Sequence, residues 1–266
     1  MCHATETLNR FGLARWMASF LDLAAIIEIH EPRARMRKRV VRELKRVGAI
    51  RFLDVLAFRL YSRLWLHTAD QQWEDRLLEE LRSRYPDIPG STRVLATGSP
   101  NSMETERLLR EVEPDIILAR CKSMLNPRIF RQAIRGTFAM DLGVCPEYRN
   151  AHGCFWALAN RDLTHVGMTL LKIDEGVDTG PVYGYYQADF DEAAQTHNMI
   201  QNMVVFDNLD ALRAKFEEIL AGEARPLDTR GRSSRSWGQP WLTSYFRWKR
   251  AARAARRVAT KASGLV

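Results

Sequence analysis

The stretch from Thr137 to Tyr185 constrains the fold more than any other part of the chain. It holds a short apolar segment that ends at Asp141, a turn reading Pro-Glu-Tyr-Arg from Pro146, and an aromatic segment that starts near His152. A second extended segment, 167–173, then leads into an acidic loop. Strand-type runs separated by turn and helix signals predict an α/β domain.

The acidic loop reads Asp-Glu-Gly-Val-Asp-Thr-Gly over residues 174–180. Gly176 and Gly180 permit a tight turn and a close approach between the backbone and a ligand. The carboxylate of Asp178 is a candidate for acid–base chemistry. The alternative is an acidic turn that only faces solvent.

Apolar runs and amphipathic segments alternate along the rest of the chain, which predicts a mostly parallel sheet with flanking helices. Further strands are expected at 23–29, 94–97, 115–121 and 182–188, and helices at 7–20, 31–48, 50–66, 73–85, 101–111, 127–134 and 192–220. Only Met1–Ala4 stand before the first helix, so the first strand is either a stub or is encoded upstream of Met1. Residues 31–66, dense in Arg and Lys, are either two packed surface helices or a basic lid that attracts an anionic substrate.

We expect one domain over residues 1–222 and an appendage over 223–266. The net charge of +8 comes from the appendage, because ten Arg and Lys and no acidic residue lie between Thr229 and the end. No apolar run approaches the roughly 20 residues of a membrane helix, and no signal segment is visible. The four cysteines form no CxxC pair, so we interpret them as reduced thiols in a cytoplasmic protein.

The turn and the acidic loop together resemble the core of the formyltransferase family, which moves a formyl group from 10-formyltetrahydrofolate to an amine. The family pattern is Asn-x-His on a strand, a Pro-x-Tyr-Arg turn, a second strand and an Asp-x-Gly-x-Asp-x-Gly loop. Here Ala139 and Asp141 replace the Asn and the His. The resemblance implies a Rossmann-type sheet, 10-formyltetrahydrofolate as formyl donor, and a small amine, such as an amino sugar, as acceptor.

The resemblance also assigns catalytic candidates. Asp178 matches the loop aspartate that, in the family, holds the His and a water. Asp141 takes the position of the His, and an ionised carboxylate is a base but not a donor to an oxyanion. If Asp141 faces Asp178, their repulsion raises one pKa and the pair can share a proton. His152 either lines the substrate side at a helix start or replaces the missing base.

Binding candidates follow from the same comparison. The segment Ser123-Met124-Leu125 resembles the loop whose backbone holds the folate pterin, and Asp174, Gly176 and Gly180 complete the candidate cofactor site. Tyr148 and Arg149 either bind an anionic group of the substrate or anchor the turn. A metal site built from Asp141, Asp174, Asp178 and His152 is a further alternative, although no short metal motif is present and no metal is predicted.

The appendage carries Trp241, Tyr245, Trp248, Ala252 and Ala255 along one helical stripe, with Arg and Lys around it. Such a helix either docks its aromatic side chains on the domain or lies on an anionic membrane, with nucleic acid as a third alternative. The tRNA-directed members of the family carry a C-terminal β domain. Residues after Gly222 lack strand-like alternation, so tRNA is not the expected substrate.

Three functions remain open from the sequence. The first is folate-dependent N-formyl transfer to a small amine by an altered site. The second is a family member that binds folate or sugar without turnover. The third is a hydrolase in which the acidic pair activates water.

Overall fold

The computed structural model describes residues 1–263, apart from the side chains of residues 35, 36 and 263. The strands are β1 Cys2–Ala4, β2 Ala25–Ile29, β3 Arg93–Thr97, β4 Ile116–Arg120, β5 Gly136–Asp141, β6 Arg149–Asn150, β7 Met168–Lys172, β8 Val182–Tyr186 and β9 Ser236–Trp237. The helical segments are η1 Leu8–Leu13, α1 Ala14–Ala18, α2 Arg33–Val47, α3 Ala49–Tyr61, η2 Ser62–Leu66, α4 His67–Arg84, α5 Met103–Val112, α6 Pro127–Phe130, α7 Gly153–Ala159, η3 Leu163–His165, α8 His197–Phe206, α9 Leu209–Ala221 and α10 Leu242–Ser263.

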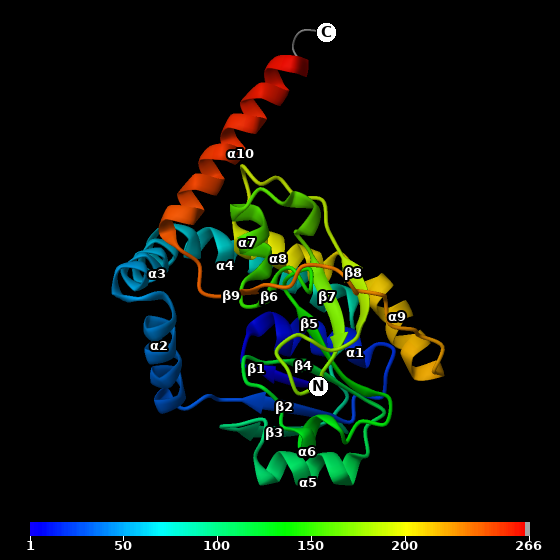
Figure 1. Cartoon of the computed structure of the whole chain (residues 1–266). Coiled ribbons are helices and arrows are strands. Elements are labelled where there is room, and N and C mark those ends of the chain that lie inside the picture. The colour runs from blue at the N-terminus through cyan, green and yellow to red at the C-terminus, as the bar shows by residue number, and fades with distance from the viewer. Residues whose placement is uncertain (264–266) are drawn as a thin grey trace.

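Seven strands form one sheet in the order β3-β2-β1-β4-β5-β7-β8. The pairs from β3 to β5 are parallel, and β7 and β8 continue the sheet in antiparallel directions. The expected α/β fold with a mostly parallel sheet and flanking helices is therefore confirmed (Figure 1). The first strand consists of three residues, Cys2–Ala4, and pairs with both β2 and β4.

The two faces of the sheet bury alternate residues of each strand, as the period of two of a β-strand requires. Ile26, Leu118 and Phe138 belong to the larger core, which also holds α1, α4, α8 and α9 residues. Ile27 and Ile117 belong to the smaller core beneath α5 and α6. The sheet is thus covered on both sides, so a ligand can reach it only at the strand ends and the connecting loops.

Three expected helix boundaries are wrong. The helix expected at 73–85 begins at His67, directly after η2. The helix expected at 127–134 ends at Phe130, because the backbone N–H groups of Ile134 and Arg135 bond to carbonyls of Pro114 and Asp115 instead of continuing it. The long helix expected at 192–220 is two helices, α8 and α9, and its first turn starts after the Thr196 cap. Ser102 caps α5, because its side-chain oxygen accepts the backbone N–H of Thr105 at 3.2 Å.

The outer side of α3 is the clearest departure from the expected packing. For residues 31–66 we expected either two packed surface helices or a basic lid, and Leu53, Leu56, Leu60 and Leu64 share one side of the second helix by their spacing. The buried side chains of α3 are instead Val55 and Phe58, and the four leucines are 41–66% exposed. The apolar side of an amphipathic helix normally faces the core, but α3 has apolar residues on two sides and buries the one that holds Val55 and Phe58.

The residues beyond 222 pack against the domain in two parts. Residues 227–238, the crossing segment, run over the edge of the turn at 146–150, where β9 pairs with β6 (Figure 1). Helix α10 then packs Tyr245, Trp248 and Ala252 into the main core. Its second half, rich in Arg, projects away from the domain (Figure 1). The aromatic stripe of the tail is therefore docked on the domain.

Candidate active site

The candidate site lies where parallel strands β4 and β5 end, the usual place for ligands in open α/β sheets. Asp141 is the last residue of β5, and the loop that starts at Cys121 follows β4. Beyond β5, the acidic loop connects β7 to β8. Three segments from separate parts of the sequence therefore meet at one end of the sheet.

Asp141 is the most perturbed acid of this group. Burial, together with the negative charge of nearby Asp178, raises the pKa of Asp141 well above its ordinary value. The thiol of Cys145 donates a hydrogen bond to Asp141 Oδ2 at 3.1 Å, and the charge of Arg120 opposes the upward shift. The structure thus brings the two predicted carboxylates together, and Asp141 is shifted toward its protonated form.

Asp178 sits in the acidic loop with a left-handed backbone, at φ 51°. Its Oδ2 accepts the backbone N–H of Asn150 at 2.8 Å, which ties the loop to the turn at 146–150. Burial raises the pKa of Asp178 as well. A carboxylate held by one N–H and partly withdrawn from water is a better base than a free aspartate.

The rest of the acidic loop is organised around Asp174. Its Oδ1 accepts the Gly176 N–H at 2.9 Å and the Thr179 hydroxyl at 2.8 Å. Gly180 lies so close to β7 that an added Cβ would stand 1.8 Å from the Lys172 carbonyl oxygen. Asp174 and Gly180 thus shape the loop. Both hydrogen bonds to Asp174 Oδ1 come from within the loop, so they assign Asp174 no role at a reacting atom.

His152 lies at the start of α7 with φ 57° and is partly buried. Burial, with smaller effects from the Lys122 and Arg59 charges, lowers the pKa of His152 to about 4. The ring is therefore neutral near pH 7. The charge of the Glu43 carboxylate opposes this lowering of the His152 pKa.

The predicted substrate residues Tyr148 and Arg149 have structural partners. Tyr148 is buried, stacks on Trp237 and donates its hydroxyl to Asp162 at 2.9 Å. Arg149 donates to the Val177 carbonyl at 2.7 Å and to Ser234 at 2.9 Å. Arg149 therefore joins the acidic loop to the crossing segment, as the anchoring alternative requires.

The predicted pterin loop lies beside the N-terminal end of α5. Asn101 fixes it by donating to the Met124 carbonyl at 2.8 Å and by accepting the Asn126 N–H at 2.7 Å. Leu125 is buried, Ser123 is half-buried and the Met124 side chain is 55% exposed. A held backbone with one exposed apolar side chain fits a flat heterocycle that bonds to main-chain groups.

Sequence reasoning missed two contributors to the site. Cys145 and Arg120 both act directly on Asp141, the first by a hydrogen bond and the second through its charge. Cys145 stands four residues after Asp141, and Arg120 ends the neighbouring strand. The parallel pairing of β4 with β5 sets Ala119 opposite Ala139 and so places Arg120 at the same end of the sheet as Asp141.

The crossing segment is the third missed contributor. Arg232 forms a two-bond ion pair with Glu147 at 2.7 and 2.9 Å, and the Trp237 indole donates to the Glu147 carbonyl. Asn150 also donates from its side chain to the Trp237 carbonyl. The turn that presents Asn150 to Asp178 is therefore held from outside the stretch 137–185.

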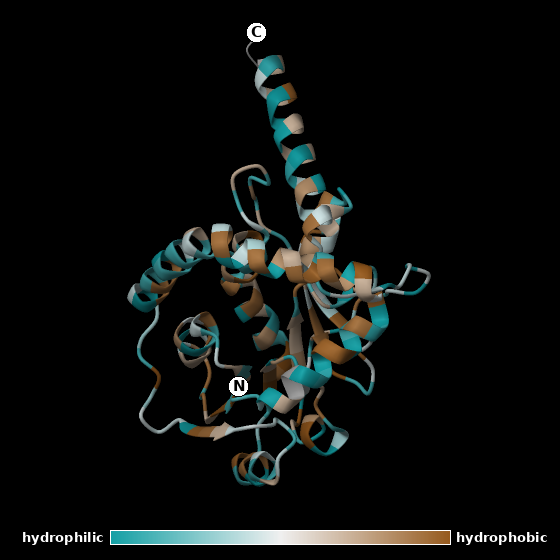
Figure 2. Ribbon diagram, turned by 90° about the vertical axis from the view of Figure 1, so that its left-hand side faces the viewer, coloured by the Kyte–Doolittle hydropathy of each residue, from teal (hydrophilic) through white to brown (hydrophobic). Residues whose placement is uncertain are grey.

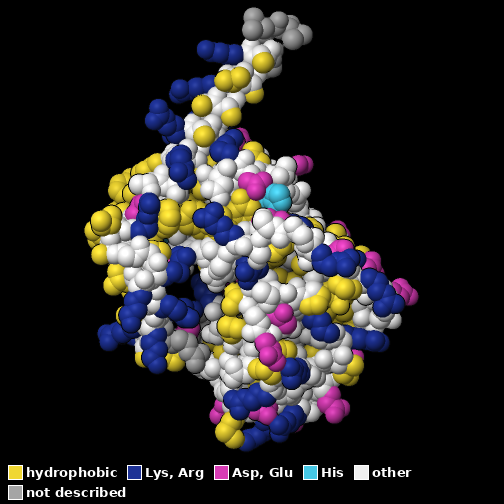
Figure 3. All heavy atoms as spheres, in the orientation of Figure 1, with side chains coloured by type: hydrophobic (Ala, Val, Ile, Leu, Met, Phe, Trp, Pro, Cys, Tyr) yellow, Lys and Arg dark blue, Asp and Glu magenta, His cyan; other side chains and the backbone are white. Residues whose placement is uncertain are grey.

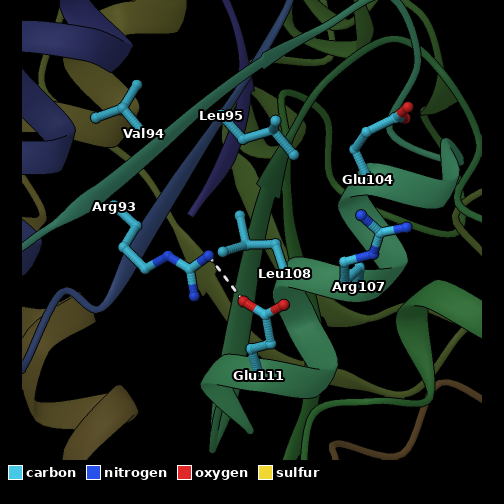
Figure 4. Close-up of a pocket in the computed structure, with 7 residues that line it drawn as sticks. All are labelled: Arg93, Val94, Leu95, Glu104, Arg107, Leu108 and Glu111. Carbon is cyan, nitrogen blue, oxygen red and sulfur yellow. Dashed lines mark ion pairs between the residues drawn. The ribbon is translucent and has the colours of Figure 1, made fainter.

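The surface around the site is strongly basic on one side. Figure 3 shows a hollow between the α2 side and the rest of the molecule, with Lys and Arg side chains in it. A different hollow lies at the β3 edge, four strands from β5, where Arg93 pairs with Glu111 at 2.8 Å (Figure 4). Within residues 1–263, no group of three His, Cys, Asp or Glu side chains is placed to hold a metal ion.

No protein-family model matches the chain. Part of the sequence is similar to methionyl-tRNA formyltransferases: that of Bacteroides fragilis is 30% identical over 131 residues, 44% of this chain and 40% of the relative. That of Kosmotoga olearia is 34% identical over 85 residues, 32% of this chain and 27% of the relative. The chain thus spans less than half the length of these relatives.

Similarity to solved structures extends further along the chain. Phosphoribosylglycinamide formyltransferase from Streptococcus pneumoniae aligns with a TM-score of 0.50 over 82% of this chain and 96% of its own, at 15% identity. Such low identity supports the fold alone. The expected resemblance is nevertheless confirmed, since both the sequence relatives and this structural neighbour are formyltransferases.

Proposed function

Because this chain resembles the formyltransferases in sequence and has their fold, we propose that it transfers a formyl group from 10-formyltetrahydrofolate to a small primary amine. The observation that carries the proposal is the partly buried pair of Asp141 and Asp178, with unequal surroundings, near the carboxyl end of β5. An amino sugar is the acceptor to test first.

The two carboxyl groups take different roles. Asp178, ionised and held by the Asn150 N–H, accepts a proton from the attacking amine. Asp141, protonated, donates a hydrogen bond to the oxygen of the formyl carbon as that oxygen becomes negative. The new C–N bond forms to the amine, the bond from the formyl carbon to folate N10 breaks, and the proton held by Asp178 passes to N10. The products are a formamide and tetrahydrofolate.

The folate donor fits the loop at 121–126 and the acidic loop. The loop at 121–126 supplies main-chain groups for the heterocycle, and Asn101 keeps that backbone in place. Ala139 supplies no amide donor, so the oxyanion depends on Asp141 more than it does where the family has Asn. The site is therefore proposed as a slower, adapted version of the family's chemistry.

Release of tetrahydrofolate, measured over a panel of amines that includes amino sugars and sugar nucleotides, tests the proposal. Asp178→Asn should lower amine-dependent release by about 10² or more, because the base is lost. Asp189→Asn changes an exposed carboxylate outside the site and serves as the matched control.

Each alternative function has its own outcome in this assay. Release of formate without any amine would identify a hydrolase. Folate binding without release for every amine would identify a binding protein. Equal rates for Asp178→Asn and the control would leave Asp178 as a shaping residue of the loop.

We also propose that the exposed half of α10 contacts an anionic membrane surface. Arg250, Arg253, Arg256 and Arg257 lie on this half and are exposed. Within the described residues, no helix is long and apolar enough to cross a membrane. The triple change Arg250→Gln, Arg253→Gln and Arg257→Gln should weaken binding to anionic vesicles, whereas unchanged binding would contradict the proposal.

A further inference from the structure

The outward side of α3 is unusual for a surface helix. Ile50, Leu53, Leu56, Leu60 and Leu64 follow one another at intervals of three or four residues and therefore share one side. Their side chains are 88%, 66%, 41%, 58% and 59% exposed. We call these five residues the apolar face of α3. A continuous row of large exposed apolar side chains on a domain marks an interaction site.

This orientation of α3 is fixed by contacts on the opposite side. Phe58 packs against the rings of Phe155, His197 and Tyr245 at centroid distances of 5.4–5.5 Å. Asp54 accepts the backbone N–H of Thr243 at the start of α10 at 3.0 Å. Turning the apolar face inward would break both sets of contacts, so it stays outside in the folded domain.

Aromatic side chains extend this surface at the far end of α3. Tyr61 contacts both Trp65 and Phe246, with ring centroids 5.2 and 5.0 Å apart. Trp65 is 64% exposed and Phe246 is 47% exposed. Figure 2 faces this side of the molecule and shows hydrophobic and hydrophilic residues alternating along its outer helices.

The charge around the apolar face has one sign. Residues 33–66 contain eleven Arg and Lys and two acidic residues. Both acids are engaged, Glu43 by Arg46 and Asp54 by Thr243. Several exposed basic side chains make no ion pair within the described part of the chain: Arg37, Lys38, Arg42, Lys45 and Arg63. Figure 3 shows basic and hydrophobic side chains intermingled on this side.

We propose that the apolar face of α3 is a membrane-contact surface, whose leucines enter the headgroup and acyl boundary of an anionic bilayer while the neighbouring arginines bind phosphates. A second copy of the chain is a poorer fit, because the two basic surroundings would repel each other. RNA satisfies the arginines but leaves the leucines exposed. An anionic bilayer satisfies both kinds of side chain, as it does for interfacial helices.

The test measures binding to phosphatidylcholine vesicles with and without phosphatidylglycerol, by co-sedimentation of the full chain. The wild type should bind only the anionic vesicles. Leu53→Gln with Leu60→Gln should lower the affinity about tenfold or more, because two apolar side chains no longer enter the boundary region. The matched control is Val94→Gln with Ile134→Gln, which changes side chains 61% and 70% exposed elsewhere and should bind as the wild type does.

Several results would overturn the proposal. Equal binding by the α3 double variant and the control would assign membrane contact to α10 alone. A wild type that ignores anionic vesicles and forms a dimer that the α3 variant breaks would make the face a self-association surface. Tight binding of bulk tRNA, lost in the α3 variant while vesicles are ignored, would assign it to RNA. The assay contains neither folate nor amine, so its outcome is independent of formyl transfer.

Discussion

At the scale of single residues, the central change is the carboxyl group at position 141. An imidazole at this point would be both a donor and a base, whereas a carboxyl group is a donor only when protonated. The surroundings of Asp141 favour that form, because burial and the Asp178 charge both raise its pKa. An Asp in place of the family's His at position 141 is therefore compatible with the proposed formyl transfer, provided that the proton stays on Asp141 during the reaction.

Substitutions of Asp141 separate its donor role from a purely structural one. Asp141→Ala removes the donor and should lower the formyl-transfer rate by about 10²–10³. Asp141→Asn keeps an N–H donor and should lose much less. Similar losses in both variants, with unchanged melting temperatures, would contradict the donor role.

The pH profile provides a second readout for the same pair. The rate should rise as pH passes the lower apparent pKa of the pair and Asp178 ionises. It should fall again on the alkaline side, as Asp141 loses its proton; both values belong to the coupled pair. Asp141→Asn should remove the alkaline fall and keep the acid side. An alkaline fall retained in Asp141→Asn would show that another group causes it.

At the scale of elements, α10 shows how one helix serves two purposes. Trp248 is fully buried in the main core, and its indole donates to Glu192 at 3.1 Å, while Phe246 two residues earlier is half-exposed. The first half of α10 therefore packs one side into the domain and exposes Phe246 on the other, whereas the second half projects away from the domain.

Two single variants, Trp248→Ala and Phe246→Ala, measure this packing when their stabilities are compared. Trp248→Ala should lower the free energy of unfolding by about 3–5 kcal/mol, since it leaves a large cavity. Phe246→Ala should cost much less, because its ring is already partly in water. Chemical denaturation of both variants is the measurement. Equal costs would mean that α10 is not docked as described.

The sequence predicted most elements, because strand periodicity and motif order are local signals. It named Asp141 and Asp178 as candidates and left open whether they face one another. It did not predict which side of α3 is exposed, because apolar residues lie on two sides of this helix. It also did not predict the part that Arg232 and Trp237 play in holding the turn. Their contacts to Glu147 span 85 and 90 residues of sequence, and no local pattern records such a pairing.

At the scale of the whole molecule, the buried His197 and the partly buried His152 contribute to the response to acid. Burial lowers the pKa of His197 to about 3 and that of His152 to about 4. Both values lie below the ordinary value near 6.5, so these residues contribute stability that is present above about pH 6.5. The contribution is lost as pH falls toward the folded-state values.

His197→Phe tests this response. The free energy of unfolding of the wild type should fall between about pH 6.5 and pH 4, with His197 adding up to about 1.4 kcal/mol per pH unit to the slope. The variant should show a shallower slope over the same range, whatever its absolute stability. Denaturant titrations at several pH values give the slopes, and identical slopes would remove His197 as a cause.

The crossing segment also has a consequence for the order in which the molecule becomes competent. Synthesis runs from the N-terminus, so Asp141, Asn150 and Asp178 leave the ribosome well before residues 232–238 exist. Until then the turn lacks the contacts from Arg232 and Trp237 that hold it beside the acidic loop. A nascent chain can thus have its sheet in place and still lack the contacts that hold the turn, which form only when the later residues arrive.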